Sequence, residues 1–338
     1  MELIHIIPRS VLAREAQGSY KDTISRVRFL ETSGIDYRQL SVERDDPDAL
    51  LATIPSDARP QRFLIEYSHF PRITRELGRY WPQALLAIRT HNIEPLQHLD
   101  NHGWWPKRGL PWVLYGMYRL FLNDCRCKQY ADVLFSINDW EDSVYWRRLP
   151  GKATVQWLPY YCPDHIIPQN PISFEQRQTI ACLPTSRKNR KSWDLVSRFC
   201  RFAESMRAAG SNYNFVVTGQ LTEWPPPVSD AVEYVGFVED LSAFMGTCRA
   251  VAVLSPLGYG FKTTIADAFA AGAHVIAHPS LIRHCPDTIR PALVPYDSES
   301  SDFACAASKR LRETPPGGAI HTQQKRRNHD MMQAWLQG

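Results

Sequence analysis

Short apolar runs recur along the first half of the chain, each bounded by polar residues or proline. They predict buried strands at residues 3–7, 37–42, 62–67, 84–89, 131–137 and 155–158. Between the first two runs, Ile24, Val27 and Leu30 are spaced by three, which predicts a helix over residues 21–33 that Gly34 ends. The order strand, helix, strand is typical of a doubly wound α/β domain.

The same alternation begins again in the second half. Strands are predicted at residues 179–183, 214–218, 232–235, 250–254, 274–277 and 291–294, with helices over 194–207, from about Asp240, and after Gly260. The stretch 159–171 contains four prolines and no periodic pattern, which is typical of a linker. We therefore expect two Rossmann-like domains, residues 1–165 and 166–320, and a C-terminal segment 321–338 that either returns to the first domain as a helix or frays.

Composition narrows the class of protein only moderately. A formal net charge of +4 over 338 residues fits anionic ligands but does not require nucleic acid. The chain has no apolar run of about 18 residues, and its first residues lack the basic start of a signal peptide. The eight cysteines are scattered, without a CxxC pair that would indicate zinc. These features predict a cytoplasmic protein with reduced thiols.

Polar residues directly follow apolar strands of the first half. Parallel strands bring their carboxyl ends to one edge of the sheet, where α/β proteins bind ligands. The candidates there for contacts with a ligand are Gly18, Ser19, Arg89, His91, Asn92 and Glu94. The alternative is that these side chains only cap helices and form local turn bonds.

An acidic run, Asp45-Asp46-Pro47-Asp48, contains the Asp-x-Asp pattern that can hold a divalent metal and a diphosphate after a buried strand. Here it lies among other charges and beside a proline. We interpret it as a solvated loop and helix start, and no metal site is predicted.

Residues 103–130 mix aromatic and basic side chains, and from Trp112 their spacing suits an amphipathic helix. One interpretation is peripheral docking to an anionic membrane surface or to a lipid-linked acceptor. The other, which we favour from the sequence, is a helix whose aromatic face joins the core and whose arginines face water.

Two loops of the second half have the chemistry of a phosphate site. Residues 186–191 form a dense basic loop at the end of one strand, and Gly258-Tyr259-Gly260 joins another strand to a helix that carries Lys262 in its first turn. Glycines allow close backbone approach, and helix N-termini favour anions. Arginine and lysine add charge-assisted hydrogen bonds to phosphate. We expect both loops at one edge of a parallel sheet, with a diphosphate between them.

The sequence around these two loops resembles that of the GT-B glycosyltransferases, and among them the large retaining family 4. The segment Asp267-Ala268-Phe269-Ala270-Ala271-Gly272 is similar to the family's Glu-Ala-Met-Ala-x-Gly, and Lys191-Ser192-Trp193-Asp194-Leu195 to its Lys-Gly-x-x-Leu. The turn 89–94 resembles a His-Asn-x-Glu turn of some members. The chain departs from the family at Tyr259, where many members have a glutamate that contacts the donor sugar.

The resemblance implies a fold of two Rossmann-like domains and transfer of a sugar from a UDP- or GDP-type donor to a saccharide or glycolipid acceptor, as in polysaccharide biosynthesis. It implies retention at the anomeric carbon, and neither a cofactor nor a metal. The implied roles are catalysis for His91, Arg187 and Lys191, and donor binding for Gly219, Gly258, Tyr259, Gly260, Phe261, Lys262, Thr263 and Asp267. On the acceptor or sugar side, the implied contacts are Gly18, Ser19, Asn92 and Glu94.

Other functions stay open at this stage. Tyr259 allows a non-catalytic nucleotide-sugar-binding subunit, and an inverting transferase or a sugar-nucleotide epimerase of the GT-B class would share the same motifs. Nucleic-acid binding rests on the 186–191 loop alone and is not expected.

Overall fold

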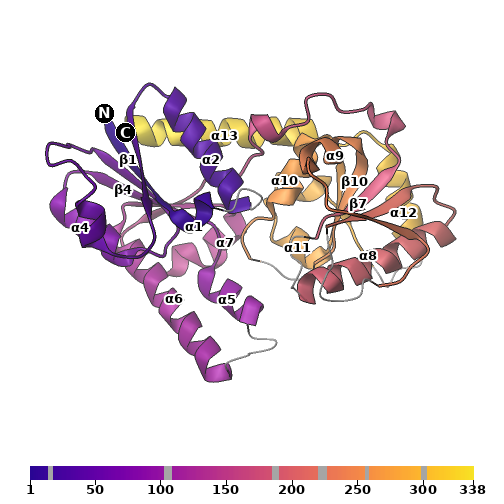
Figure 1. Cartoon of the computed structure of the whole chain (residues 1–338), viewed down its shortest axis with the longest axis horizontal. Helices are drawn as coiled ribbons and strands as arrows, with labels where there is room; N and C mark the ends of the chain where they lie inside the picture. Colours follow the sequence, from indigo (N-terminus) through magenta and orange to yellow (C-terminus); the bar gives the residue numbers. More distant parts are fainter. Residues whose placement is uncertain (14–17, 103–108, 185–189, 220–226, 256–258, 298–302) are drawn as a thin grey trace. The chain divides into compact units, whose positions relative to one another are not determined.

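The computed structural model of the chain describes residues 1–13, 18–102, 109–184, 190–219, 227–255, 259–297 and 303–338. It divides into two compact units (Figure 1). The first contains Met1–Tyr160, Gly258–Phe261 and Lys325–Gly338, and the second contains Tyr161–Leu257 and Lys262–Gln324. The change from one unit to the next after Tyr160 falls at the start of the proline-rich stretch, five residues before the expected boundary.

The first unit is built on a six-stranded parallel sheet with the order β2-β1-β3-β4-β5-β6. Its strands are β1 (Glu2–Pro8), β2 (Asp36–Val42), β3 (Arg62–Glu66), β4 (Leu85–Thr90), β5 (Val133–Ser136) and β6 (Thr154–Trp157). The described helices between them are α1 (Arg9–Leu12), α2 (Gly18–Thr32), α3 (Pro47–Leu51), α4 (Pro71–Tyr80), α5 (Glu94–His102), α6 (Leu110–Tyr130), α7 (Asp139–Val144) and the 3-10 turn η1 (Trp146–Arg148).

Successive strand residues of this sheet face opposite sides, which divides its core into two layers. Ile4, Phe63 and Leu86 face a layer formed with α3, α4 and α6. Leu3, Leu64 and Ala87, one position away on the same strands, face α2 and the C-terminal helix α13. Because helices cover both faces of this sheet, its inner strands consist of nearly continuous apolar residues. The hydrophobic pattern of the sequence therefore predicted them.

The second unit repeats this architecture with the strand order β12-β11-β10-β7-β8-β9. All its strand pairs are parallel, and the strands are β7 (Thr179–Cys182), β8 (Asn214–Thr218), β9 (Val232–Gly236), β10 (Cys248–Val253), β11 (His274–Ala277) and β12 (Val294–Pro295). Its described helices are α8 (Arg190–Ala208), α9 (Leu241–Thr247), α10 (Thr263–Ala270), α11 (Pro279–Arg283), α12 (Phe303–Arg312) and the 3-10 turns η2 (Asp164–Ile166), η3 (Phe174–Gln176) and η4 (Arg290–Ala292). Helices α8 and α12 cover one face of this sheet, and α10 packs on β10 and β11. The prediction of two doubly wound parallel sheets is confirmed.

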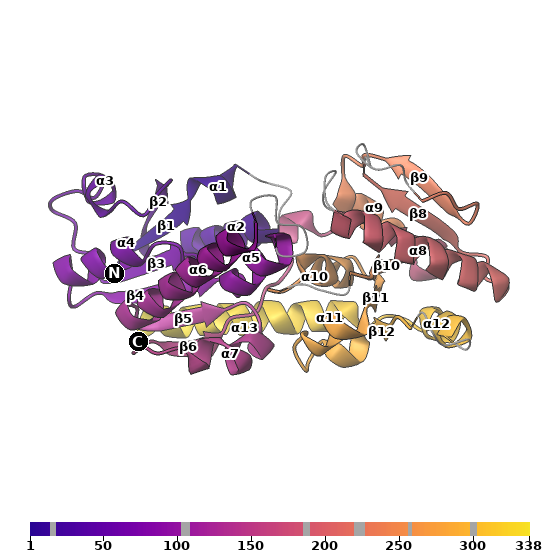
Figure 2. The same ribbon diagram turned by 90° about the horizontal axis from the view of Figure 1, so that it is seen from below.

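The last helix, α13 (Gly317–Gln337), begins in the second unit and ends in the first. In Figure 2 its C-terminal half lies beside β5 and β6. Met332, Trp335 and Leu336 are buried there against Leu3 and Phe135. The Trp335 ring meets the Phe135 ring edge-on at 5.8 Å. Of the two alternatives for the C-terminal segment, the structure therefore has the returning helix, because an apolar stripe needs a sheet face to cover.

Three local expectations need correction or refinement. Arg290–Ala292 is a 3-10 turn, so the strand expected at 291–294 shrinks to Val294–Pro295. The acidic run caps helices, as expected of a helix start: Asp46 accepts a hydrogen bond from the Ala49 amide at 3.3 Å in α3. Asp45 accepts from the Ile73 amide at 2.9 Å at the start of α4.

The favoured interpretation of residues 103–130 is wrong. Residues 103–108 lie outside the described parts of the chain, but in α6 the side chains of Tyr115, Tyr118 and Phe121 face outward. Tyr115 is 65% exposed and Tyr118 is 58% exposed, while Val113 and Asp124 on the opposite side are buried. Helix α6 packs on α4 and α5 through that opposite side, so its aromatic residues are not needed for the core.

Candidate functional site

The strand order of the first sheet reverses at β1, which has β2 on one side and β3 on the other. In doubly wound proteins, ligands bind beside such a point, at the carboxyl ends of the strands. Glu66 is the last residue of β3 and pairs in register with Arg89 of β4. His5 of β1 lies on the same face of the sheet, two positions before Ile7 in the alternation. This is the face that α2 covers, and α2 places Asp22 and Arg26 above it.

Asp22, Arg26, Glu66 and Arg89 form what we call the buried ion network. The Arg26 guanidinium donates to both oxygens of Glu66, at 2.9 Å from Nε and 2.6 Å from Nη2. Arg89 donates to both oxygens of Asp22, at 2.9 Å and 3.0 Å. A further ion pair of 2.8 Å joins Arg26 to Asp22. All four side chains are at most 1% exposed, and their two positive and two negative charges balance.

Two histidines attach to this network. His5 contacts Glu66 through Nε2 at 2.8 Å and Tyr37 through Nδ1 at 3.0 Å. Burial lowers the pKa of His5 despite the neighbouring Glu66 carboxylate, so the ring is neutral, donates from Nε2 to Glu66 and accepts from the Tyr37 hydroxyl. Burial opposes ionisation of Glu66, but Arg26 and the two histidines outweigh it and hold the pKa of this carboxyl well below its usual range.

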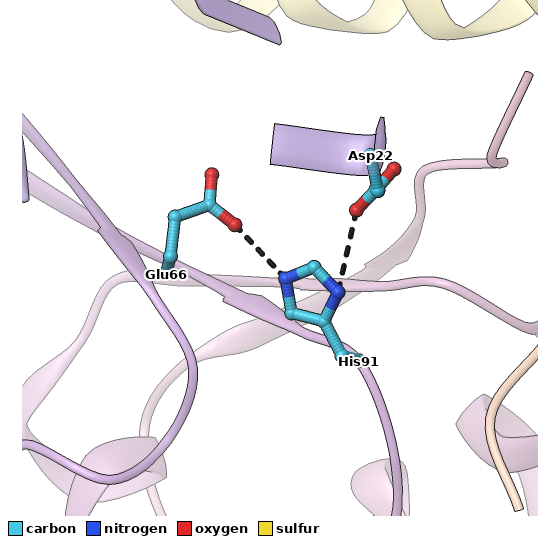
Figure 3. A group of neighbouring side chains, drawn as sticks. All are labelled: Asp22, Glu66 and His91. Atoms are coloured by element: carbon cyan, nitrogen blue, oxygen red, sulfur yellow. Dashed lines mark hydrogen bonds and ion pairs between the residues drawn. The ribbon is translucent and has the colours of Figure 1, made fainter. Parts of the chain in front are cut away.

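Figure 3 shows His91 between the two carboxylates. Its Nε2 lies 3.0 Å from Glu66 Oε2, and its Nδ1 lies 3.5 Å from Asp22 Oδ2. An ionised Glu66 can only accept, so the proton of this hydrogen bond sits on His91 Nε2. Both nitrogens thus face carboxylates of the first unit, and the ring is buried.

The three side chains of Figure 3 also have the composition of a metal site. One ligand atom from each of Asp22, Glu66 and His91 lies within 4.8 Å of the others. However, both carboxylates already accept bidentate bonds from arginines, so a divalent ion would have to displace cations that already neutralise them. The arrangement therefore fits a self-neutralised network better than a metal centre.

Tyr67 follows Glu66 in a backbone conformation that is rare for a residue with a side chain. Its φ is +73°. This turns the phenol ring over the His91 ring, with centroids 4.2 Å apart and planes inclined by 18°. The ring of His69 also lies against the phenol ring, at 5.2 Å between centroids. Such a conformation costs free energy and persists where the surroundings impose it, frequently at ligand sites.

A second polar cluster lies beside this aromatic stack. The Ser68 hydroxyl donates to Asp124 at 2.5 Å, and the Tyr145 hydroxyl donates to the other Asp124 oxygen at 2.7 Å. Burial raises the pKa of Asp124 to about 7, although these two hydrogen bonds oppose the shift. His69 and Glu94 form an ion pair of 3.3 Å at the more accessible side of the cluster. Their interaction overcomes burial, so the pKa of Glu94 is lowered and that of His69 is raised.

Replacing Asp124 by asparagine is expected to change how stability depends on pH. Because the folded pKa of about 7 exceeds the unfolded value of 3.8, the folded state binds more protons, and Asp124 makes the wild type less stable as pH rises between these values. Asp124→Asn should therefore be more stable than the wild type by about 2–4 kcal/mol at pH 8 and nearly equal at pH 4. Urea unfolding at several pH values measures this. The exposed Asp57→Asn is the control, and parallel pH profiles for wild type and Asp124→Asn would contradict the assignment.

The structure brings several predicted residues of the first unit to one region. His91, Asn92 and Glu94 follow β4, and Gly18 and Ser19 form the first turn of α2 instead of a loop. Ser19 hydrogen-bonds to the Tyr67 side chain, so this turn reaches the aromatic stack.

The hydrophobic pattern and the motifs did not indicate the residues that connect this region: Asp22, Arg26, Glu66, Tyr67 and Asp124. One signal was available. Asp22 and Arg26 are four apart on the helix whose apolar residues face the sheet, and Glu66 directly follows the apolar run Phe63-Leu64-Ile65.

In the second unit, the direction changes between β7 and β10, which are parallel neighbours. The basic loop follows β7 and the glycine-rich loop follows β10. The carboxyl ends of these two strands lie at one edge of the sheet, and the place of the loops themselves stays a prediction. Arg187 and Gly258 fall outside the described residues. Lys191 lies in the first turn of α8, whose start is four residues earlier than predicted, and its side chain is likewise not described.

The remaining donor-site candidates are placed as follows. Lys262 is the N-cap of α10 and Thr263 its first residue, so the lysine precedes the first turn. Asp267 lies deeper in α10 and is only 3% exposed. Gly219 follows β8 with a φ of +82°, and Gly260 has a φ of +76°. Tyr259, Gly260 and Phe261 group with the first compact unit.

Residues 180–313 match the family model "Glycosyl transferases group 1". This segment contains both loops that flank the β7–β10 switch point. Solved structures match over the whole chain, with two Rossmann-like sheets of the GT-B fold. By its fold the whole chain is a GT-B protein, and its residues 180–313 are similar to the glycosyl transferases group 1.

Three solved GT-B structures illustrate the likeness. The chain superposes on sucrose-phosphate synthase from Thermosynechococcus elongatus with a TM-score of 0.64 at 12% identity, covering 100% of this chain and 99% of that one. The TM-score with HepE of Anabaena in complex with UDP is 0.60 at 11% identity, and 100% of both chains is covered. The TM-score with an α,α-trehalose-phosphate synthase (UDP-forming) from Burkholderia vietnamiensis is 0.56 at 13% identity, again with full coverage of both chains. No curated protein sequence matches the chain.

Proposed function

We propose that the chain transfers a sugar from a nucleotide diphosphate sugar to an acceptor hydroxyl, with retention at the anomeric carbon. The observation that carries this proposal is the adjacency of β7 and β10 in the glycosyl transferases group 1 segment, because it brings together the carboxyl ends of the strands that precede the basic loop and the glycine-rich loop. HepE of Anabaena has been solved with UDP and with UDP-glucose, which favours a UDP donor over a GDP donor. The acceptor class that we propose is a saccharide or glycolipid of a surface polysaccharide pathway.

The chemical task is to stabilise the negative charge that develops on the leaving diphosphate. Arg187 and Lys191 from the basic loop would supply cations, and the N-terminal amides of α8 and α10 would supply further donors. Lys262, the N-cap of α10, would add a third cation opposite them. Asp267 is proposed to accept from the ribose hydroxyls, which requires the donor to reach a side chain that is mostly buried.

In the first unit, the buried ion network is proposed to hold the turn His91-Asn92-Ile93-Glu94 in place. His91 has both nitrogens directed at carboxylates, so its contribution is to shape the sugar side of this turn and not to act as a free base. The more accessible Glu94–His69 pair is the part of this region that can meet an acceptor.

A thermal-shift screen against UDP-, GDP-, TDP- and ADP-sugars tests donor binding without knowledge of the acceptor. A ligand at 100 times its Kd stabilises by about 2.7 kcal/mol, so the true donor should raise the melting temperature by several degrees. Release of the nucleoside diphosphate, and the anomeric configuration of the product by NMR, then test transfer and retention. No shift with any donor contradicts the proposal. A shift without nucleotide release on any acceptor would favour the second candidate, a non-catalytic donor-binding subunit, which the tyrosine at position 259 suggests.

We also propose that transfer needs no metal, because the loop cations can neutralise the diphosphate themselves. Activity, followed as nucleotide release, should therefore persist at excess EDTA with less than about twofold loss. Full loss that Mg²⁺ or Mn²⁺ restores would refute metal-free transfer while leaving donor transfer itself intact.

A further inference from the structure

Helix α6 exposes an apolar face that the proposed transfer reaction does not use. Six of the twelve exposed large hydrophobic side chains in the described parts of the chain lie within its first twelve residues. Leu110, Leu114, Tyr118 and Phe121 are spaced by four, four and three, so they form one stripe along the helix, and Tyr115 adjoins it. We call these five side chains the α6 apolar face. Concentration of this kind indicates an interaction surface, since scattered single residues would need no explanation.

The core does not account for this face. On the opposite side of α6, Val113, Asp124 and Cys127 are buried, and α6 packs on α4 and α5. Figure 1 shows α5 and α6 side by side, extending away from the β-strands of the first unit. Trp112 turns toward α5, with its ring 5.3 Å from the rings of both His98 and His102.

Charge indicates what the α6 apolar face contacts. Between Asp100 and Asp124 the sequence contains no acidic residue, but it contains Lys107, Arg108 and Arg119. Arg119 is exposed in the middle of α6. Leucine and aromatic side chains beside basic residues are the combination by which a helix lies in the interface of an anionic bilayer.

We propose that the α6 apolar face docks the protein onto an anionic lipid bilayer, with tyrosine and leucine side chains among the headgroups and Arg119 beside anionic phosphates. None of the described helices is both long and apolar enough to span a bilayer, so the contact is peripheral. Helix α5 begins at Glu94, directly after the His91 turn, and packs along α6. Helix α5 therefore connects the docked helix α6 to the His91 turn at the carboxyl edge of the first sheet.

The test is sedimentation of the full chain with vesicles of phosphatidylcholine alone or mixed with phosphatidylglycerol. The wild type should bind the mixed vesicles, and less so at high salt. Tyr115→Ser/Tyr118→Ser should lower the partition coefficient about tenfold or more. Arg119→Glu should lower it about tenfold for the mixed vesicles only.

The matched control is Tyr80→Ser/Phe237→Ser, which removes two equally exposed aromatic rings elsewhere and should bind like the wild type. Equal melting temperatures show that the variants are folded. Absence of vesicle binding by the wild type, or equal binding by all variants, overturns the proposal. The proposal is also overturned if light scattering shows that the wild type is a dimer, that Tyr115→Ser/Tyr118→Ser dissociates this dimer, and that neither protein binds vesicles. Vesicle binding does not depend on catalysis. A chain that binds vesicles but transfers no sugar would therefore contradict the proposed function and leave the membrane proposal intact.

Discussion

Replacing Glu66 by alanine is expected to destabilise the protein by about 3–5 kcal/mol, because the Arg26 guanidinium stays buried without the Glu66 carboxylate that it pairs with. Glu66 accepts from Arg26, His5 and His91, and it is completely buried. Its lowered pKa means that this stabilisation is present above the unfolded pKa and is lost in acid as pH falls through the folded value. Urea or thermal unfolding at neutral pH measures the effect.

The control for this experiment is Glu43→Ala. Glu43 also pairs with an arginine, Arg9, but both side chains are largely exposed, so the loss should stay below about 1 kcal/mol. If Glu66→Ala does not fold, Glu66→Gln keeps the shape and removes only the charge. The double variant Glu66→Met/Arg26→Met should recover part of the loss, because it removes both buried charges. Equally small losses of unfolding free energy for Glu43→Ala and Glu66→Ala would show that the buried ion network stabilises the protein no more than a surface ion pair does.

Replacing Lys191 by alanine is expected to lower turnover at least about tenfold with the fold intact, and together with Arg187→Ala about a hundredfold. The physical reason is the loss of preorganised positive charge where the leaving diphosphate becomes more negative. Lys191 lies in the first turn of α8, at the carboxyl end of β7, so its ammonium would add to the anion affinity of the helix start. Nucleotide release at saturating donor measures turnover.

Two variants separate this role from a general effect of charge. Lys191→Arg retains the cation and should lose much less activity than the alanine variant. Lys309→Ala removes an equally charged side chain from the exposed face of α12 and should leave turnover unchanged. An unchanged rate for Lys191→Ala would remove this residue from the proposed phosphate clamp, and equal melting temperatures would exclude misfolding as the cause of any loss.

Most of the fold was predictable from local patterns. The expected strand at 214–218 has the observed bounds of β8, and that at 274–277 those of β11, because strands buried on both faces are apolar throughout. Expected ends were less accurate where a cap or turn decides them. Helix α8 starts at Arg190 and not at Asp194, and η4 replaces the start of the last strand. Polar and proline-containing ends carry little periodic signal.

The candidate site was predictable only in part. The position of His91, Asn92 and Glu94 after a buried strand follows from the sequence, since the carboxyl ends of parallel strands share one edge. The ion network was not predictable. Asp22 and Arg26, four apart on a helix, look like an ordinary surface pair, and only the packing of α2 on β3 and β4 brings them to Glu66 and Arg89.

The sequence by itself determined two parallel α/β sheets, the loops that bear the polar residues, and the family resemblance, because strand and helix periods and short motifs are local properties. Tertiary structure alone decided that β7 and β10 are neighbours, that α13 returns to the first unit, and that both nitrogens of His91 face carboxylates. It also decided that the aromatic face of α6 points outward. These features depend on which surfaces meet across long sequence separations, and an amphipathic pattern does not state which of its two faces will be covered.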